Sequence, residues 1–223
     1  MNYAASAAAY PARKTCMPIL EHDLTVKVHC GLPSLVGEML AAPGAVLSGH
    51  FELLSGLHAD RFLAFSRIAG DEQMLGDIAD WLLPGIGPTL PDAIAAPKTA
   101  GVALGWMLSR RLGIPFHLAT VDEGGRADAM LGAPDLGGRR VLLVNDVVTT
   151  GDGFEALATA AKDAGAEIAG AAWFVSRSDG TDIEARLDTP GFSIATMVMP
   201  AWPAAGCALC GAHEPTRLGL DLN

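Results

Sequence analysis

The segment that most constrains this chain lies at residues 140–154 and reads RVLLVNDVVTTGDGF. An apolar run leads into a polar pair, Asn145 and Asp146, and then into a loop rich in Thr and Gly at 149–153. Apolar side chains then recur at helical spacing through 154–165. The segment therefore predicts a buried strand, a glycine-rich loop and a helix. The N–H groups of such a loop and the positive end of the helix together suit a phosphate, and the polar pair suits the hydroxyl groups of a sugar.

The order of residues in this segment also carries a family resemblance. An apolar run, two polar residues, two valines and Thr-Thr-Gly resemble the phosphoribosyl-pyrophosphate (PRPP) motif of type I phosphoribosyltransferases. The resemblance implies that the polar pair holds the ribose and that the loop wraps the 5′-phosphate. The substrate-binding residues that it assigns are Asn145, Asp146, Val147, Val148, Thr149, Thr150, Gly151, Asp152 and Gly153. An ordinary strand–loop–helix unit with a polar turn is the alternative.

Three residues of the segment depart from the family pattern. Asn145 stands where the family usually has an acid, so it can hydrogen-bond a hydroxyl group but cannot act as a base. Asp152 places a carboxylate in the phosphate loop, where it repels a phosphate unless the side chain points away. Gly153 replaces a residue with a hydroxyl donor. These departures favour, as an alternative function, binding without transfer.

Composition limits the classes of partner. The 223 residues suit one α/β domain with small additions, and the formal net charge of −10 argues against nucleic acid or an anionic membrane as the main partner. A highly anionic substrate would therefore need positive charge concentrated at its site. The chain has no apolar run of membrane-spanning length and no signal-peptide pattern at its N-terminus, so we expect a cytoplasmic protein.

Strand and helix patterns alternate from residue 70 onward. This alternation predicts an α/β fold with a parallel sheet, helices on both faces and the ligand at the carboxyl ends of the strands. The expected helices lie at 71–83, ended by Pro84, and at 102–112, and the other expected strands at 92–96, 115–120, 167–176 and 193–199. Lys98 and Thr99 follow the first of these strands. The resemblance implies that their turn receives the pyrophosphate, whereas a solvated loop lysine is the alternative for Lys98.

Two further segments resemble orotate phosphoribosyltransferases. The run Gly-x-Phe-x-Leu-x-Ser-Gly at 49–56 resembles their N-terminal hood, and a plain β-hairpin is the alternative. The resemblance implies that Phe62 faces the base. It also implies that Arg177, after the strand at 167–176, grips the orotate carboxylate, for which a planar guanidinium is suited. A salt bridge at the rim to Asp179 or Asp182 is the other interpretation of Arg177.

The polar segment 121–138 predicts a mobile loop, and in the family this loop closes over the active site. Arg126 is its cation, and we expect it to assist the departing pyrophosphate. Four acids accompany it, which weighs against ordinary turnover because stabilising the departing charge is usually the main catalytic contribution in such chemistry. They are Asp122, Glu123, Asp128 and Asp135.

A Cys-x-x-Cys pair, Cys207 and Cys210, lies near the C-terminus with His213 close behind. Such a pair is half of a structural zinc site and needs two more ligands. The N-terminal segment offers candidates, namely Cys16, His22, His29 and Cys30. Two unreactive buried thiols without metal are the alternative.

The whole pattern predicts a leader at 1–30, loosely attached or packed near the tail, a hood at 31–69, a phosphoribosyltransferase core at 70–200 and a tail at 201–223. The resemblance implies an enzyme that moves phosphoribose from PRPP, with Mg²⁺, to orotate or a related base. Asp146 and Arg126 are its expected catalytic residues, and a homodimer is implied. The alternatives are a sugar-phosphate or nucleotide binding protein without catalysis and a transferase redirected to another base.

Overall fold

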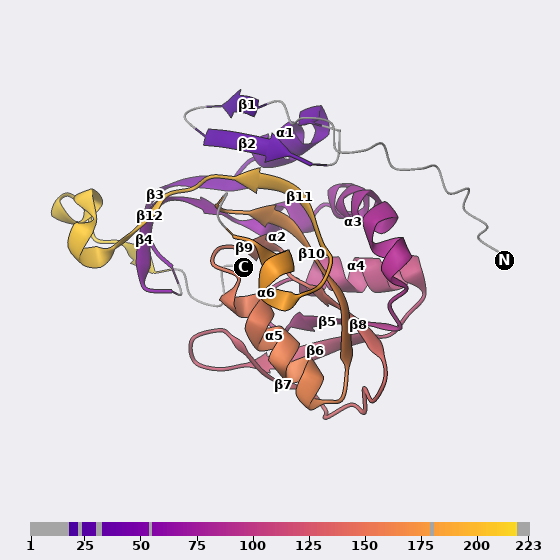
Figure 1. Cartoon of the computed structure of the whole chain (residues 1–223). Coiled ribbons are helices and arrows are strands. Elements are labelled where there is room, and N and C mark those ends of the chain that lie inside the picture. The colour runs from indigo at the N-terminus through magenta and orange to yellow at the C-terminus, as the bar shows by residue number, and fades with distance from the viewer. Residues whose placement is uncertain (1–17, 22–23, 30–32, 54, 179–180, 218–223) are drawn as a thin grey trace.

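The computed structural model describes residues 18–21, 24–29, 33–53, 55–178 and 181–217 (Figure 1). Within these residues, nine strands form the main sheet, and β11, β10, β8, β5 and β6 run parallel. Antiparallel strands extend both edges, and β9 pairs with β10. In spatial order the strands are β1 (Pro18–Glu21), β2 (Leu24–Val28), β11 (Gly191–Met197), β10 (Glu167–Ser176), β8 (Arg140–Val144), β5 (Ala93–Pro97), β6 (Phe116–Val121) and β7 (Ala127–Met130), with β9 at Val147–Val148.

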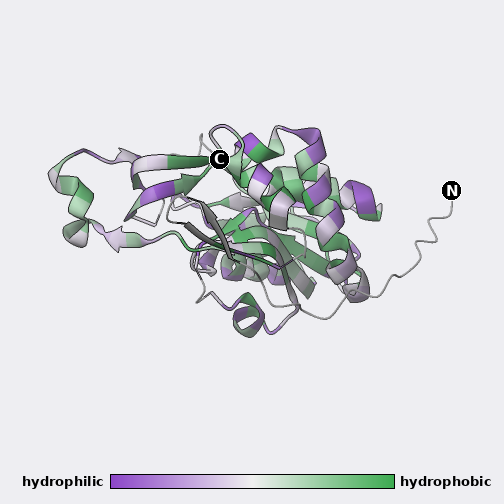
Figure 2. Cartoon of the chain, turned by 90° about the horizontal axis from the view of Figure 1, so that it is seen from above, coloured by the Kyte–Doolittle hydropathy of each residue, from purple (hydrophilic) through white to green (hydrophobic). Residues whose placement is uncertain are grey.

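Helices cover both faces of this sheet, which confirms the predicted layers. Successive residues of β8 show the division: Leu142 and Val144 face one core, while Val141 and Leu143 face the other. The first core contains α1 (Pro33–Ala41), α2 (Phe65–Ala69), α3 (Glu72–Ile86) and α4 (Val102–Leu112), and the second contains α5 (Asp152–Asp163) and α6 (Ile183–Leu187). Hydrophobic residues follow the strands in Figure 2, whereas the helices alternate between hydrophobic and hydrophilic stretches.

Helix α3 begins where the sequence predicts and ends later. Asp71 is its N-cap and accepts hydrogen bonds from the backbone N–H groups of Gln73 and Met74. The predicted end at Pro84 is wrong, because the helix continues to Ile86, which is fully buried against the sheet. Burial of this last turn offsets the hydrogen bond that proline cannot donate.

A second, four-stranded sheet among the described residues joins the hood to the tail. In the expected hood region, strands β3 (Val46–Glu52) and β4 (Leu57–Leu63) form an antiparallel hairpin. Strand β12 (Ala201–Pro203) pairs with β4, and β13 (Thr216–Arg217) pairs with β3. Short 3-10 turns complete this part of the chain and the end of α3, at η1 (Gly87–Thr89), η2 (Ala204–Gly206) and η3 (Ala208–Gly211). The hood and the tail are therefore parts of one sheet, although more than a hundred residues separate them.

Two loosely structured segments of the prediction contain strands. In the expected leader, β2 pairs with β11 and so extends the main sheet, whereas residues 1–17 lie outside the described part of the chain. The expected mobile loop at 121–138 contains β7, which pairs with β6. Thr120 stabilises this hairpin, since its side chain accepts from the N–H of Ala129 and donates to the same residue's carbonyl.

Candidate active site

A cavity of about 520 Å³ lies where the loop between β8 and α5 meets the hood. The predicted substrate residues at 145–153 all line it, together with the predicted Phe62, Arg126 and Arg177. The remaining lining residues are Leu53, Ser55, Leu63, Phe65, Ala100, Gly124 and Phe154. The structure thus brings residues from five separate segments of the sequence to one cavity.

The loop before α5 has the form that the phosphate interpretation requires. Gly151 precedes the helix at φ +91°, a conformation that favours glycine, and an added Cβ would lie 2.9 Å from a methyl carbon of Ile183. The carbonyl of Thr149 accepts a hydrogen bond from the Thr181 hydroxyl, and the carbonyl of Thr150 accepts one from Arg186. Because N–H and C=O point in opposite directions across a trans peptide, the N–H groups of Thr150 and Gly151 point away from these partners.

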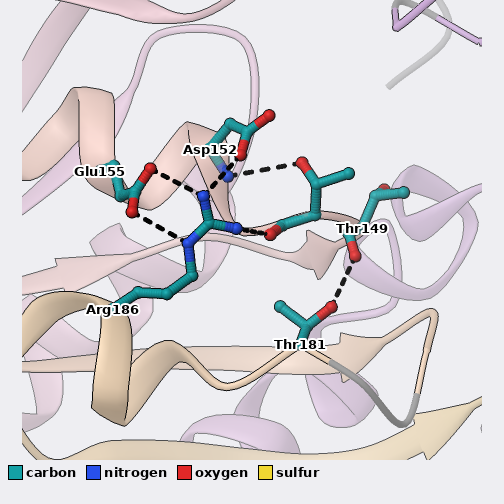
Figure 3. A network of polar contacts seen from close by, with 6 residues as sticks. Thr149, Asp152, Glu155, Thr181 and Arg186 are labelled. Atoms are coloured by element: carbon teal, nitrogen blue, oxygen red, sulfur yellow. Dashed lines mark hydrogen bonds and ion pairs between the residues drawn. The ribbon is translucent and has the colours of Figure 1, made fainter.

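Arg186 of α6 counters the carboxylate that the sequence places in this loop (Figure 3). Its Nη2 donates to Asp152 Oδ1 at 2.7 Å and to Glu155 Oε2 at 2.8 Å, and its Nε donates to Glu155 Oε1 at 2.9 Å. These hydrogen bonds are the main cause that lowers the pKa of both carboxyl groups below their ordinary values. Asp152 is therefore ionised at neutral pH and paired with a guanidinium. Sequence reasoning missed Arg186, since 34 residues separate it from Asp152.

The polar pair at the end of β8 is held rigidly. Asp146 is 9% exposed, and its Oδ1 accepts a hydrogen bond from the N–H of Val147 at 2.6 Å. Burial raises the pKa of Asp146, while backbone hydrogen bonds from Val147 and Gly101 oppose the shift. The side-chain oxygen of Asn145 accepts from the N–H of Asp146 at 2.9 Å. Its amide nitrogen remains as a donor for a hydroxyl group.

Gly101 lets the turn after β5 approach this pair closely. It has φ +69°, and an added Cβ would lie 2.7 Å from the Cα of Asn145 and 2.9 Å from the carbonyl oxygen of Val144. A side chain at position 101 would therefore displace the backbone of Val144 and Asn145. The turn after β5 is thus in direct contact with the end of β8, where the polar pair lies.

Arg177 is a buried cation in the wall of the cavity. Its side chain is 5% exposed, Nη2 donates to the carbonyl of Arg61 at 3.4 Å, and Nε has no hydrogen-bond partner among the described residues. Burial lowers its pKa, and the nearby Asp60 opposes this shift. The position is not the rim, and Asp182 instead caps α6 by accepting from Ala185, whereas Asp179 lies outside the described residues. A buried guanidinium with an unpaired N–H suits a carboxylate ligand.

Comparison with known proteins shows the family of the chain. Residues 72–205 match the phosphoribosyl transferase domain. The chain belongs to the phosphoribosyltransferase family. An orotate phosphoribosyltransferase of Caulobacter vibrioides is 33% identical over 167 residues, which cover 73% of this chain and 83% of the relative. Another, from Methylorubrum extorquens, is 31% identical over 192 residues, with 84% and 95% covered.

Comparison with solved structures identifies the fold. The crystal structure of orotate phosphoribosyltransferase from Aeropyrum pernix is similar with a TM-score of 0.60 and 28% identity, and the match covers 74% of this chain and 93% of that one. This similarity confirms the predicted type I phosphoribosyltransferase-like sheet. The PRPP-motif resemblance at 140–154 lies inside the matched domain.

The residues predicted to bind pyrophosphate in this phosphoribosyltransferase are more exposed to solvent than Asp146 and Arg177. Lys98 and Thr99 follow β5 but do not line the cavity, and the Lys98 side chain is exposed. Arg126 does line the cavity, with its side chain 63% exposed and its Nε 3.5 Å from Asp122 Oδ2. Asp122 closes the turn of the hairpin by accepting from the N–H of Arg126, and this bond is the main cause that lowers its pKa.

The predicted thiol pair lies outside the cavity, in the tail. Among the described residues, His50 and His58 of the hood approach Cys207 and Cys210. Of the N-terminal candidates, His29 hydrogen-bonds Thr196, while Cys16, His22 and Cys30 lie outside the described residues. His50 and His58 lie eight residues apart, one on each strand of the hairpin. This pair of histidines was a signal in the sequence that could have identified the partners of the cysteines.

Proposed function

We propose that this phosphoribosyltransferase transfers phosphoribose from PRPP to orotate or a closely related carboxylated base and releases pyrophosphate. The bond between ribose C1 and the pyrophosphate oxygen breaks, and a bond from C1 to a ring nitrogen of the base forms. The observation that carries the choice of base is Arg177, a largely buried cation whose side chain lines the cavity. The similarity to curated orotate phosphoribosyltransferases supports the same choice.

Each part of PRPP has a partner in the site. Asn145 and Asp146 bind the ribose hydroxyl groups, and the negative charge of Asp146 stabilises the positive charge that develops on the ribose as pyrophosphate departs. The loop at 149–153 binds the 5′-phosphate with its N–H groups and the N-terminus of α5. Arg126 in the cavity lining receives the pyrophosphate, assisted by Lys98 and Thr99 of the turn after β5, which lies outside that lining.

Mg²⁺ is expected to accompany PRPP and to neutralise pyrophosphate charge. Because Mg²⁺ retains several waters and binds mainly substrate phosphates, it needs few protein ligands. The Asp146 carboxyl group lines the cavity and would be such a ligand. A bound cation would lower the pKa that burial raises and so favour the ionised carboxylate. Zn²⁺ at Cys207 and Cys210 concerns the tail and takes no part in the transfer.

The base faces the hood in this proposal. Phe62 lies in the cavity wall and its ring centroid is 6.1 Å from that of Phe51, which supports it from behind. An aromatic face and a buried guanidinium together suit a flat, carboxylated ring.

A second candidate is a protein that binds PRPP or a nucleotide but transfers slowly or uses another base. The cation at the pyrophosphate end favours it, because Arg126 is largely exposed and is paired with Asp122. Such a cation stabilises departing charge weakly.

Isothermal titration calorimetry with PRPP and Mg²⁺, followed by turnover with orotate, separates these candidates. We expect micromolar affinity, loss of binding in Asp146→Ala, and unchanged binding in the control Asp163→Ala at the exposed end of α5. Binding with turnover on orotate supports the main proposal, and binding without turnover on orotate supports the second. No binding at millimolar PRPP would refute the main proposal.

We also propose that the enzyme is a cytoplasmic homodimer with no nucleic-acid or membrane partner. Within the described residues, no helix is both long and apolar enough to span a membrane. Trp106 of α4 is 53% exposed and Leu131 is equally exposed, and both offer apolar surface to a second copy. Light scattering coupled to size exclusion should give twice the 23.0 kDa chain mass, and a monomer at micromolar concentration contradicts the dimer.

A further inference from the structure

Four side chains with metal-binding atoms meet between the hood and the tail. His50 comes from β3, His58 from β4, and Cys207 and Cys210 from the turns that follow β12. One ligand atom of each lies within 4.8 Å of all the others. His50, His58 and Cys207 are buried, at 7%, 6% and 8% exposed, whereas Cys210 is exposed. None of the four lines the active-site cavity.

Four of the six distances between these atoms lie within about half an ångström of the edges of a tetrahedron around zinc. With Zn–S near 2.3 Å and Zn–N near 2.0–2.1 Å, a tetrahedral site places sulfur and nitrogen about 3.5 Å apart and two nitrogens about 3.3 Å apart. Cys207 Sγ lies 3.5 Å from His50 Nε2, and Cys210 Sγ lies 3.8 Å from His50 Nε2 and 3.2 Å from His58 Nδ1. The two histidine nitrogens are 2.9 Å apart. A small outward movement of one ring completes the geometry.

A second shell fixes the orientation of one imidazole. His50 Nδ1 lies 2.7 Å from the backbone carbonyl oxygen of His213, which can only accept a hydrogen bond. Nδ1 therefore carries the proton, so Nε2 keeps its lone pair and points into the cluster. Metal-binding histidines commonly have such a carbonyl partner. The backbone turn of the cysteine pair is also formed, because the N–H of Cys210 donates to the carbonyl of Cys207 at 3.3 Å.

We propose that His50, His58, Cys207 and Cys210 bind a structural zinc ion that links the tail to the hood. Four protein ligands fill a tetrahedral site and leave no position for a reacting group, so the ion has no catalytic role. It instead joins the β3–β4 hairpin to the tail within one sheet. Strand β4 of this sheet carries Phe62 and Leu63 of the cavity wall. The zinc thereby holds in place the strand that faces the base. This inference does not depend on which base is used.

The test measures the metal directly on the full chain, produced without a histidine tag under reducing conditions. We expect one zinc per chain by inductively coupled plasma mass spectrometry. After removal of zinc by a chelator, Co²⁺ should give the intense visible absorption of a tetrahedral site and a thiolate charge-transfer band. Removal should also lower the melting temperature, and added Zn²⁺ should restore it.

Variants separate the proposed ligand set from its alternatives. Cys207→Ser and His58→Gln should reduce the zinc content to near zero. His213→Ala should keep the metal, because this residue contributes its backbone carbonyl, and His117→Gln is the control for a histidine away from the cluster. If His213→Ala loses zinc while Cys207→Ser retains it, the ligand set is wrong.

The wild-type chain alone also decides the question should a variant not fold. A folded wild-type protein, judged by far-ultraviolet circular dichroism, that holds no stoichiometric zinc and gives no cobalt spectrum would overturn the proposal. The four side chains would then be a hydrogen-bonded cluster of two imidazoles and two thiols.

Discussion

Replacing Arg177 by glutamine tests the assignment of the base. The side chain is 5% exposed, so water screens its contact with a bound carboxylate very little. A hydrogen bond to a charged group contributes about 1.5–3 kcal/mol, and each 1.4 kcal/mol corresponds to about tenfold. We therefore expect kcat/KM for orotate to fall by about 10- to 150-fold. For uracil, which has no carboxylate, the change should stay below about threefold, since no charged contact is lost.

The same substitution should leave the fold intact. Burial lowers the pKa of Arg177 and its Nε lacks a partner, so the charge is held at a cost in free energy in the absence of ligand. The one hydrogen bond that Arg177 Nη2 donates, to the carbonyl of Arg61, is long at 3.4 Å, so little is lost with it. The free energy of unfolding in urea should therefore be unchanged or higher, and the loss of activity cannot be ascribed to unfolding.

Steady-state kinetics with orotate and uracil at saturating PRPP and Mg²⁺ measure the effect. Arg61→Gln is the matched control, because it removes a neighbouring guanidinium that pairs with Asp60 and does not line the cavity. Arg177→Lys should give an intermediate loss, since it keeps the charge and loses the planar fork. An equal loss for orotate and uracil, or orotate kinetics within twofold of wild type, would refute the carboxylate assignment.

Three further substitutions test the PRPP end. Arg186→Ala should weaken PRPP binding at least tenfold in calorimetry, because Asp152 loses its counter-charge, and the added change Asp152→Asn should restore much of it; no restoration contradicts the charge argument. Asp146→Asn should weaken PRPP binding yet raise the free energy of unfolding at neutral pH. Because burial raises the folded-state pKa of Asp146, the wild type loses stability as pH rises from the ordinary value of 3.8 through the raised one. The increase in the free energy of unfolding caused by Asp146→Asn should therefore vanish below pH 3.8 in urea titrations. An increase that does not depend on pH refutes this argument. Gly101→Ala should destabilise the chain by about 1–3 kcal/mol in urea unfolding, since its Cβ would meet Asn145 at 2.7 Å, and a neutral result would show that the turn can move.

Local sequence patterns predicted the fold class and the part of the candidate site that lies in the segment 140–154. The run at 140–154 determines its own conformation, because the apolar strand, Gly151 and the helical spacing of α5 are all contained within it. Every predicted residue of this segment reached the cavity. The hairpin of β3 and β4 corresponds to the alternative given for the hood segment at 49–56, whereas β2 lies within the expected leader.

Features that depend on packing between distant segments could not be predicted. Arg186 reaches Asp152 because α6 packs beside α5, and its role is visible only in that arrangement. The same holds for His50 and His58, which meet the cysteines because β12 returns to β4. Where tertiary burial competed with a local signal, burial decided the outcome, as in the continuation of α3 beyond Pro84.

The acidic character of the chain weighs less against an anionic substrate than its net charge of −10 suggests. Two acids of the loops around the cavity are engaged by partners of their own: Asp152 by Arg186, and Asp122 by the backbone and guanidinium of Arg126. Their charges are partly neutralised at contact distance, while more distant acids are screened within about 8 Å at physiological ionic strength. A phosphate at the loop therefore meets mainly the N–H groups of Thr150 and Gly151 and the N-terminus of α5. Local pairing, and not the total charge, decides what this site can bind.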